Sequence, residues 1–255
     1  MTDTPEAGFF GFELYEPNKP GAENVNSYTA RLYRDVTGLM RSEMGPIYVE
    51  PVNLESVTLL PSRAVLHRND HAINLDARRV TEETRSLPIE RQKAQLFKSG
   101  VIVSKRLSDA IILLHELCHE MYETTNPPPA VNETKDSRDR MISEGFATFM
   151  DIYFISLLSG RPELLGLSKE DQEALEEAKR YRIGKLKELR HKHSHRVEGV
   201  LLMHRIFKQA KDEAGKDNQA GLQAIRAYID GVDRESALTI SRTEVSTTDS
   251  LEIAA

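Results

Sequence analysis

Apolar residues recur at helical spacing near the beginning of the chain. They stand three or four positions apart, at Tyr28, Leu32, Val36 and Leu39. This spacing predicts a helix over residues 26–44. Between residues 46 and 80 the pattern changes to short β-branched runs, such as IYVEPVNL and AINLDA, which are separated by Pro, Ser, Asn and Asp. Because the connections between these runs are short, we expect a small, mostly antiparallel sheet.

The remainder of the chain has mainly helical patterns. A polar helix is expected over residues 81–98, and an apolar helix, capped by Ser104 or Ser108, is expected to run to about Tyr122. The proline-rich segment NPPPAVNETKDS at 126–137 ends that helix. Further helices are expected at about 138–159, 168–190, 197–214 and 219–228. A helix, a small sheet and then several helices make an α+β fold.

The polarity of the two ends suggests one domain between irregular termini. Residues 1–25 are rich in Gly, Pro and Asn and are expected to form an irregular leader. Residues 241–255 are polar and are expected to be a disordered tail. The single predicted domain therefore covers residues 26–240.

Composition narrows the class of protein. The chain has 255 residues, enough for one large core. Its one cysteine, Cys118, cannot form a disulfide within the chain. No apolar run approaches the roughly 20 residues of a membrane span, and MTDTPEAGFF lacks the basic and apolar regions of a signal peptide. We expect a cytoplasmic protein that binds no membrane, with its oligomeric state open.

Residues 115–119, His-Glu-Leu-Cys-His, carry the clearest chemical motif. On a helix, His115 and His119 lie on one face, one turn apart, where two imidazoles can bind one Zn²⁺. Glu116 can then take a proton from a zinc-bound water as general base. The alternative is a pair of core histidines without a metal, because a motif with three specified positions also arises by chance.

A catalytic zinc requires a third protein ligand and an open coordination position. Glu144 lies 25 residues after His119 and precedes the segment GFATFMD on a second predicted helix. A carboxylate oxygen is an ordinary zinc ligand. Glu144 is therefore the candidate third ligand.

An HExxH helix followed by a glutamate on a second helix resembles the gluzincin metallopeptidases. The segment SEGFATFMD is similar to the NEGxAxxxE segment of leukotriene-hydrolase-type aminopeptidases and to the second ligand helix of thermolysin-like proteases. The resemblance covers residues 108–156 and implies a zincin-like fold, a zinc-dependent peptidase and Glu144 as third ligand. Asp151 matches the acidic position of that segment and could accept a hydrogen bond from a ligating histidine.

The chain also departs from these families. The insertion at 126–137 lengthens the gap between His119 and Glu144, and there is no GxMEN-like segment, so aminopeptidase specificity does not transfer. The metzincin pattern needs Gly and His where this chain has Tyr122 and Thr125. Cys118 is expected to be a small packing residue beside the zinc ligands.

Two segments could supply the donor that stabilises the oxyanion of peptide hydrolysis. Tyr181 begins a Tyr-x-x-Gly pattern similar to that of the aminopeptidases. His195 begins a His-x-x-x-Gly pattern similar to that of thermolysin-like enzymes, with Arg196 where the aminopeptidases have tyrosine. We favour His195 because the helix that follows is more apolar. The alternative is a solvated basic turn, because His191, His193 and His195 alternate with polar residues.

In zincins an edge strand beside the metal helix pairs with the substrate backbone. Residues 71–75, HAINL, are the candidate because they form the last strand-like run before the helices. The alternative is an ordinary strand of the core sheet.

A basic segment stands out in a chain of formal net charge −6. Residues 179–208 contain ten Lys or Arg and two Glu. This segment could bind an acidic partner such as nucleic acid or an acidic protein, or it could be a solvated helix face balanced by the acidic residues 170–177.

The sequence therefore predicts a zincin-like peptidase that acts on a peptide or protein substrate with Zn²⁺. His115, His119 and Glu144 are the predicted ligands. The alternative function is a non-catalytic binding module that uses residues 179–208. A SprT-like protease recruited by nucleic acid is disfavoured, because the chain lacks a second zinc-binding cysteine cluster.

Overall fold

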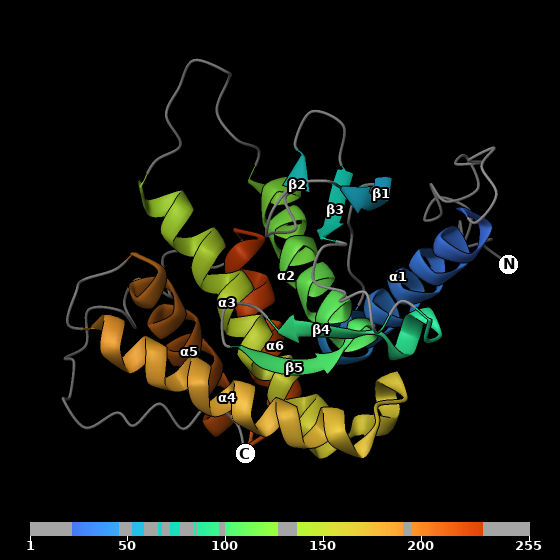
Figure 1. The fold of residues 1–255 in the computed structure, drawn as a ribbon. Helices are drawn as coiled ribbons and strands as arrows, with labels where there is room; N and C mark the ends of the chain where they lie inside the picture. Colours follow the sequence, from blue (N-terminus) through green and yellow to red (C-terminus); the bar gives the residue numbers. More distant parts are fainter. Residues whose placement is uncertain are drawn as a thin grey trace, which may run out of the picture.

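The computed structural model describes residues 22–45, 53–58, 66–67, 72–76, 84, 86–96, 100–126, 137–190 and 195–231. The described part is mostly helical and contains six α-helices and two small sheets (Figure 1). The helices are α1 (Ala22–Met44), α2 (Lys105–Thr125), α3 (Ser137–Gly160), α4 (Lys169–Arg190), α5 (His195–Glu213) and α6 (Asn218–Ile229). The predicted helices from residue 138 onward are confirmed, and α1 begins within the predicted leader, at Ala22. Residues 1–21 and 232–255, with the predicted tail, lie outside the described residues.

The first sheet has three strands in the order β1 (Asn53–Thr58), β3 (Ala72–Asp76) and β2 (Leu66–His67). β1 pairs with β3 in parallel, and β2 pairs with β3 in antiparallel orientation. The parallel pairing of β1 with β3 departs from the predicted antiparallel pattern. After β1 the chain crosses to the far side of β3, forms β2 there, and returns as β3 between the two other strands. β3 was expected to be an edge strand that pairs with substrate. It is instead the middle strand of this sheet, with β1 on one side and β2 on the other.

The second sheet corrects the prediction of a polar helix over residues 81–98. Ile89–Arg91 forms a 3₁₀ turn, and β4 (Lys93–Leu96) pairs with β5 (Val101–Ser104) in an antiparallel hairpin. Buried and exposed residues alternate along β4, which is the period of a strand with one buried face. Gly100 takes a φ of +76° in the turn, which glycine adopts without steric cost. The sequence did not predict this strand because β4 has only two apolar residues, too few to show the alternation.

Helix α2 begins directly after β5. The Ser104 hydroxyl accepts a hydrogen bond from the backbone N–H of Leu107, so Ser104 is the N-cap. The other candidate, Ser108, is inside the helix and donates to the Gln95 carbonyl of β4. The first bond marks the beginning of the histidine helix, and the second joins this helix to the hairpin.

Helix α3 is the central element and packs against both α2 and α5. The window Arg138–Gly160 is long and apolar enough to cross a membrane by length and composition, yet 78% of it is buried within the protein. An apolar helix that is covered by its own fold needs no lipid to bury it. We therefore describe α3 as a core helix.

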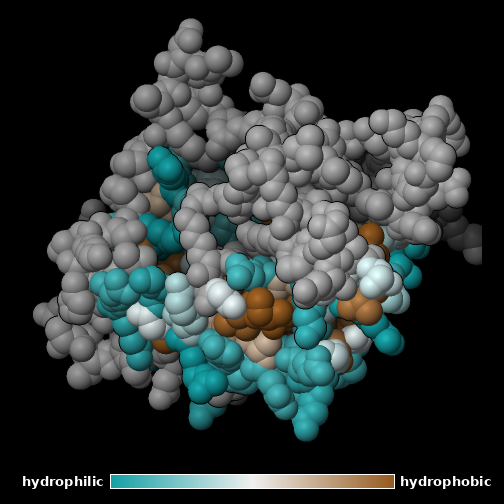
Figure 2. All heavy atoms as spheres, in the orientation of Figure 1, coloured by the Kyte–Doolittle hydropathy of each residue, from teal (hydrophilic) through white to brown (hydrophobic). Residues whose placement is uncertain are grey.

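Two clusters of buried side chains hold the helices together. The larger contains buried residues of all six helices and of the β4–β5 hairpin. The smaller consists of Ile152, Leu186, Val197 and Val200 and joins α3, α4 and α5. Figure 2 shows hydrophilic residues over most of the coloured face, a hydrophobic area near its middle and smaller hydrophobic areas toward its sides. Among the residues whose side chains are described, the exposed large apolar ones are Leu87, Ile102 and Tyr181.

The closest helix approach joins α3 and α5 through two glycines. A Cβ atom on Gly145 would overlap the backbone of Gly199, and one on Gly199 would overlap the Met141 carbonyl oxygen. Only residues without a side chain permit this backbone contact. The contact lies next to Glu144, so it brings α5 to the candidate metal ligands.

We expect Gly199→Ala to destabilise the protein by about 1–3 kcal/mol, because its methyl group cannot be accommodated without shifting α5. Gly184→Ala is the matched control, since nothing lies within 4 Å of its added Cβ on α4. That variant should be neutral or gain up to about 1 kcal/mol from helix propensity. Urea unfolding measures both. Equal stability of the two variants would contradict the close-contact argument.

Candidate metal centre

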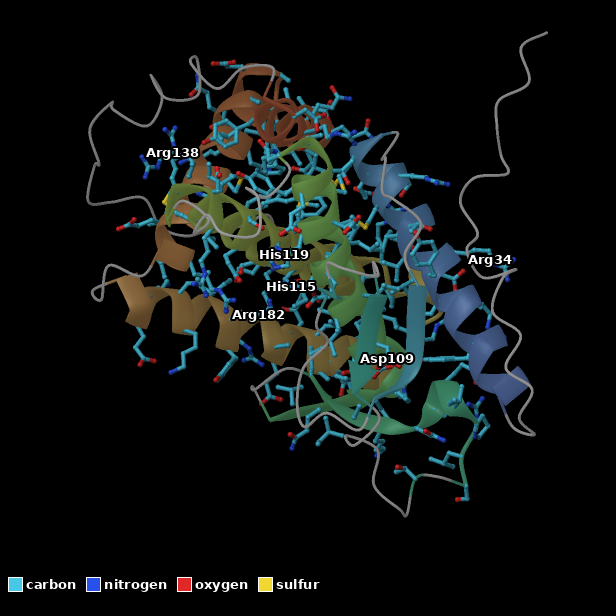
Figure 3. The ribbon with its side chains drawn as sticks, turned by 90° about the horizontal axis from the view of Figure 1, so that it is seen from above. Arg34, Asp109, His115, His119, Arg138 and Arg182 are labelled. Atoms are coloured by element: carbon cyan, nitrogen blue, oxygen red, sulfur yellow. The ribbon has the colours of Figure 1, made fainter. Side chains whose placement is uncertain are left out.

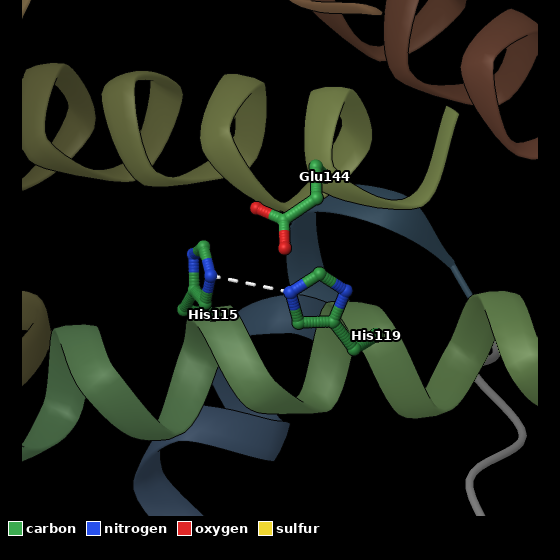
Figure 4. A group of neighbouring side chains, drawn as sticks. All are labelled: His115, His119 and Glu144. Atoms are coloured by element: carbon green, nitrogen blue, oxygen red, sulfur yellow. Dashed lines mark hydrogen bonds between the residues drawn. The ribbon is translucent and has the colours of Figure 1, made fainter. Parts of the chain in front are cut away.

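Two imidazole rings from α2 form the base of the site (Figure 4). The Nε2 atoms of His115 and His119 are 3.2 Å apart, and the ring planes are 84° from parallel. Zn–N bonds of about 2.0–2.1 Å at a tetrahedral angle place two nitrogens about 3.3 Å apart. The histidine pair therefore already has nearly the spacing that one zinc ion requires.

Glu144 comes from α3 and faces the histidine pair (Figure 4). One ligand atom from each of His115, His119 and Glu144 lies within 4.8 Å of the others, and all three residues are half-buried. It is the one group of three His, Cys, Asp or Glu in the described part of the chain that could hold a metal. The structure thus brings together the three residues predicted as ligands.

The outer nitrogen of each ring is held by a neighbouring side chain on α3. Asp151 Oδ2 lies 2.9 Å from His115 Nδ1, and Ser143 Oγ lies 2.8 Å from His119 Nδ1. Because Asp151 is a carboxylate, His115 donates its Nδ1 proton and directs the lone pair of Nε2 toward the metal position. The predicted hydrogen bond between Asp151 and a histidine of the motif is present.

Asp151 also binds Arg182 of α4, whose Nη1 lies 2.5 Å from the same Oδ2 atom. Figure 3 shows Arg182 and His115 close together between the helices. Burial raises the pKa of Asp151, but Arg182 and His115 lower it by more, so the pKa is below its usual value. Burial lowers the pKa of His115, but Asp151 and Glu116 raise it, so the pKa is above its usual value. The carboxylate therefore stays ionised between its two partners.

Arg196 approaches the third ligand from the first turn of α5. Its Nε atom lies 3.1 Å from Glu144 Oε2, and its Nη2 atom binds the same oxygen. Burial raises the pKa of Glu144, but this arginine and the nearby histidines lower it overall. Both arginine contacts use Oε2, and no hydrogen bond to Oε1 is found from the described residues. Oε1 is the oxygen left for a metal.

The two other residues of the motif differ in burial. Glu116 is half-buried on α2 between the histidines, and its negative charge raises the pKa of His115. Cys118 is fully buried, and burial raises the pKa of its thiol. A protonated, buried thiol agrees with its predicted packing role.

The candidate oxyanion donors occupy different places. Tyr181 is 39% exposed on α4, and it is the next residue, Arg182, that reaches Asp151. His195 is the first residue of α5, but its side chain lies outside the description. His71, His191 and His193 also lie outside the described residues. Both donor assignments stay predictions.

The basic segment is partly used by the protein itself. Arg182 and Arg196 bind carboxylates of the candidate site, and Lys185 binds Glu188 at 2.7 Å. These contacts reduce the charge available to an outside partner.

Sequence reasoning did not assign Ser143, Arg182 and Arg196 to the metal site. Ser143 immediately precedes Glu144, and that adjacency is the one local signal it carries. Arg182 and Arg196 belong to segments that were considered for the oxyanion, but their carboxylate partners lie 31 and 52 residues away in the sequence. Only the packing of α4 and α5 on α3 brings them together.

We expect Ser143→Ala to weaken zinc binding about tenfold or more, because His119 loses the hydroxyl that orients its ring. Ser159→Ala is the control, since Ser159 is a buried hydroxyl of the same helix that binds Glu176 instead. Competition with a colorimetric chelator measures both affinities. An equal loss in the two variants would indicate a general effect on α3.

Comparison with known proteins places this chain in no family. No family model, curated protein or solved structure matches it. The functional argument therefore rests on the geometry of its own residues.

Proposed function

We propose that this chain is a zinc-dependent peptidase with a zincin-like fold of gluzincin type. The observation that carries the proposal is the convergence of two imidazoles and one carboxylate, from α2 and α3, within 4.8 Å. The HExxH motif and the downstream glutamate support the same assignment. Strands that precede the histidine helix, and a second ligand helix packed beside it, are consistent with such a fold.

The donor set favours zinc as the metal. Two nitrogens and one carboxylate oxygen are the ligands of many catalytic zinc sites, in which a fourth position stays open. Calcium and magnesium prefer oxygen ligands throughout. The 3.2 Å spacing of the two Nε2 atoms is close to the spacing of two nitrogens bound to one tetrahedral zinc ion.

A bound zinc ion would lower the pKa of a water molecule and polarise the scissile carbonyl. Glu116 takes one proton from the attacking water, whose oxygen adds to the carbonyl carbon. The C–N bond then breaks, and Glu116 delivers the proton to the leaving nitrogen. The second proton of the water leaves the new carboxylic acid and is taken up by the released amine, so the products are one carboxylate and one ammonium group. Asp151 and Ser143 hold the imidazoles in place throughout.

The purified protein should bind one zinc ion per chain, and Glu144→Ala should lower the affinity at least a hundredfold through the loss of a ligand. Mass spectrometry for metals, with chelator competition, measures this. Glu173→Ala is the control, because Glu173 is an exposed carboxylate on α4. Full zinc retention by Glu144→Ala would refute the ligand assignment.

We expect Glu116→Gln to retain zinc but lose peptide hydrolysis by about 10²–10⁴-fold, because the amide cannot accept the proton. The assay is cleavage of a diverse peptide library, read by mass spectrometry, with zinc content measured in the same samples. Undiminished cleavage would remove Glu116 as the base. Zinc binding without cleavage of any peptide by the wild type would instead favour the binding-module alternative.

A further inference from the structure

Arg196 contacts the candidate metal ligand Glu144 but remains accessible to solvent. Its side chain is 51% exposed, although it binds Glu144. A guanidinium has five N–H donors, and the described contacts use only its Nε and Nη2 atoms on one oxygen. The guanidinium therefore has donors to offer a second anion next to the candidate site.

The packing of α5 determines where the backbone of Arg196 lies. This residue belongs to the first turn of α5, and the Gly145–Gly199 backbone contact holds that helix against α3, three residues further on. Val197 and Val200 are buried in the cluster that α5 shares with α3 and α4. The positive end of the α5 dipole lies at the same turn, which further favours a negative group.

The balance of charge at the site depends on the metal. Three carboxylates, Glu116, Glu144 and Asp151, lie near two guanidinium groups, Arg182 and Arg196. The formal charge is thus one negative without a metal and one positive with a divalent cation. An anionic ligand would be repelled in the first state and attracted in the second.

We propose that Arg196 is a specificity residue that binds a carboxylate of the substrate. This inference rests on the peptidase function proposed above and names its substrate class: peptides with a carboxylate close to the scissile bond. An extended chain covers about 3.3–3.6 Å per residue, and Arg196 contacts a metal ligand directly. The carboxylate therefore lies within about two residues of the cleaved bond. It belongs either to the C-terminus or to an Asp or Glu side chain.

The test measures binding, so it does not depend on turnover. Zinc-loaded Glu116→Gln protein is titrated with three fluorescent pentapeptides of one neutral sequence: a free acid, a C-terminal amide, and an amide with one internal Glu. The free acid or the Glu peptide should bind at least tenfold more tightly than the neutral amide, and a chelator should weaken this preference because the site then loses two positive charges. Which of the two binds more tightly identifies the source of the carboxylate.

Adding Arg196→Gln should remove the preference, because it should lower the affinity for the carboxylate peptides more than the affinity for the neutral amide. Arg196→Lys should retain part of it, because a single ammonium keeps the charge but not the forked geometry. Arg180→Gln is the matched control, since Arg180 is an exposed cation of α4 whose Nε binds the Glu176 carbonyl. Zinc content is measured in every sample.

Three results would overturn the assignment: no preference for a carboxylate, a preference that survives Arg196→Gln, or an equal loss for all three peptides. An equal loss for all three peptides would mean that Arg196 holds Glu144 in place and does not bind the substrate. Failure of the proposed peptidase is seen separately, because it appears as absence of cleavage by the wild type whatever the binding preference.

Discussion

The rest of the site depends on the interactions of one buried carboxylate, that of Asp151, with His115 and Arg182. Asp151 is 1% exposed, and an isolated charge at such a place would cost several kcal/mol. It is stabilised by His115 from α2 and Arg182 from α4, while it belongs to α3 itself. One charge thus requires three helices to meet. The same bond orients the ring of His115, so the stability of the fold and the geometry of the metal position have a common origin.

The second constraint is the backbone contact between Gly145 and Gly199. Side chains elsewhere keep helix axes about 8–10 Å apart, whereas here α3 and α5 touch directly. The contact places the first turn of α5, and with it Arg196, at Glu144. Without the glycine contact, Arg196 would not lie beside Glu144, and the carboxylate of Glu144 would lack this positive partner.

The local elements around the site were largely predictable. The histidine helix and the second ligand helix have long apolar stretches with clear ends, and such segments fold as helices in most surroundings. The β4–β5 hairpin was missed because its strand β4 has only two buried side chains, Ala94 and Leu96, among polar neighbours. A pattern of two residues does not distinguish a strand from a polar helix. The hairpin is instead stabilised by contact with α2, which local sequence does not encode.

Partners far apart in the chain could not be predicted in the same way. The interaction of Arg196 with Glu144 spans 52 residues, and that of Arg182 with Asp151 spans 31. Each arginine stands in a run of basic residues that equally suits a solvated surface. Which arginine turns inward depends on helix packing, because only a buried or half-buried carboxylate gains enough from the pair to hold the side chain in one place.

By itself, the sequence determined the residue types of the metal site and the spacing of its two histidines, because one helical turn joins them regardless of the surrounding fold. It also determined that Glu144 and Asp151 share a helix face two turns apart. Tertiary structure alone decided that this face meets the histidines, that Ser143 and Asp151 hold the two rings, and that Arg182 and Arg196 neutralise the carboxylates. The physical reason is that these contacts join separate helices, whose relative positions follow from core packing and from a glycine contact between two distant segments.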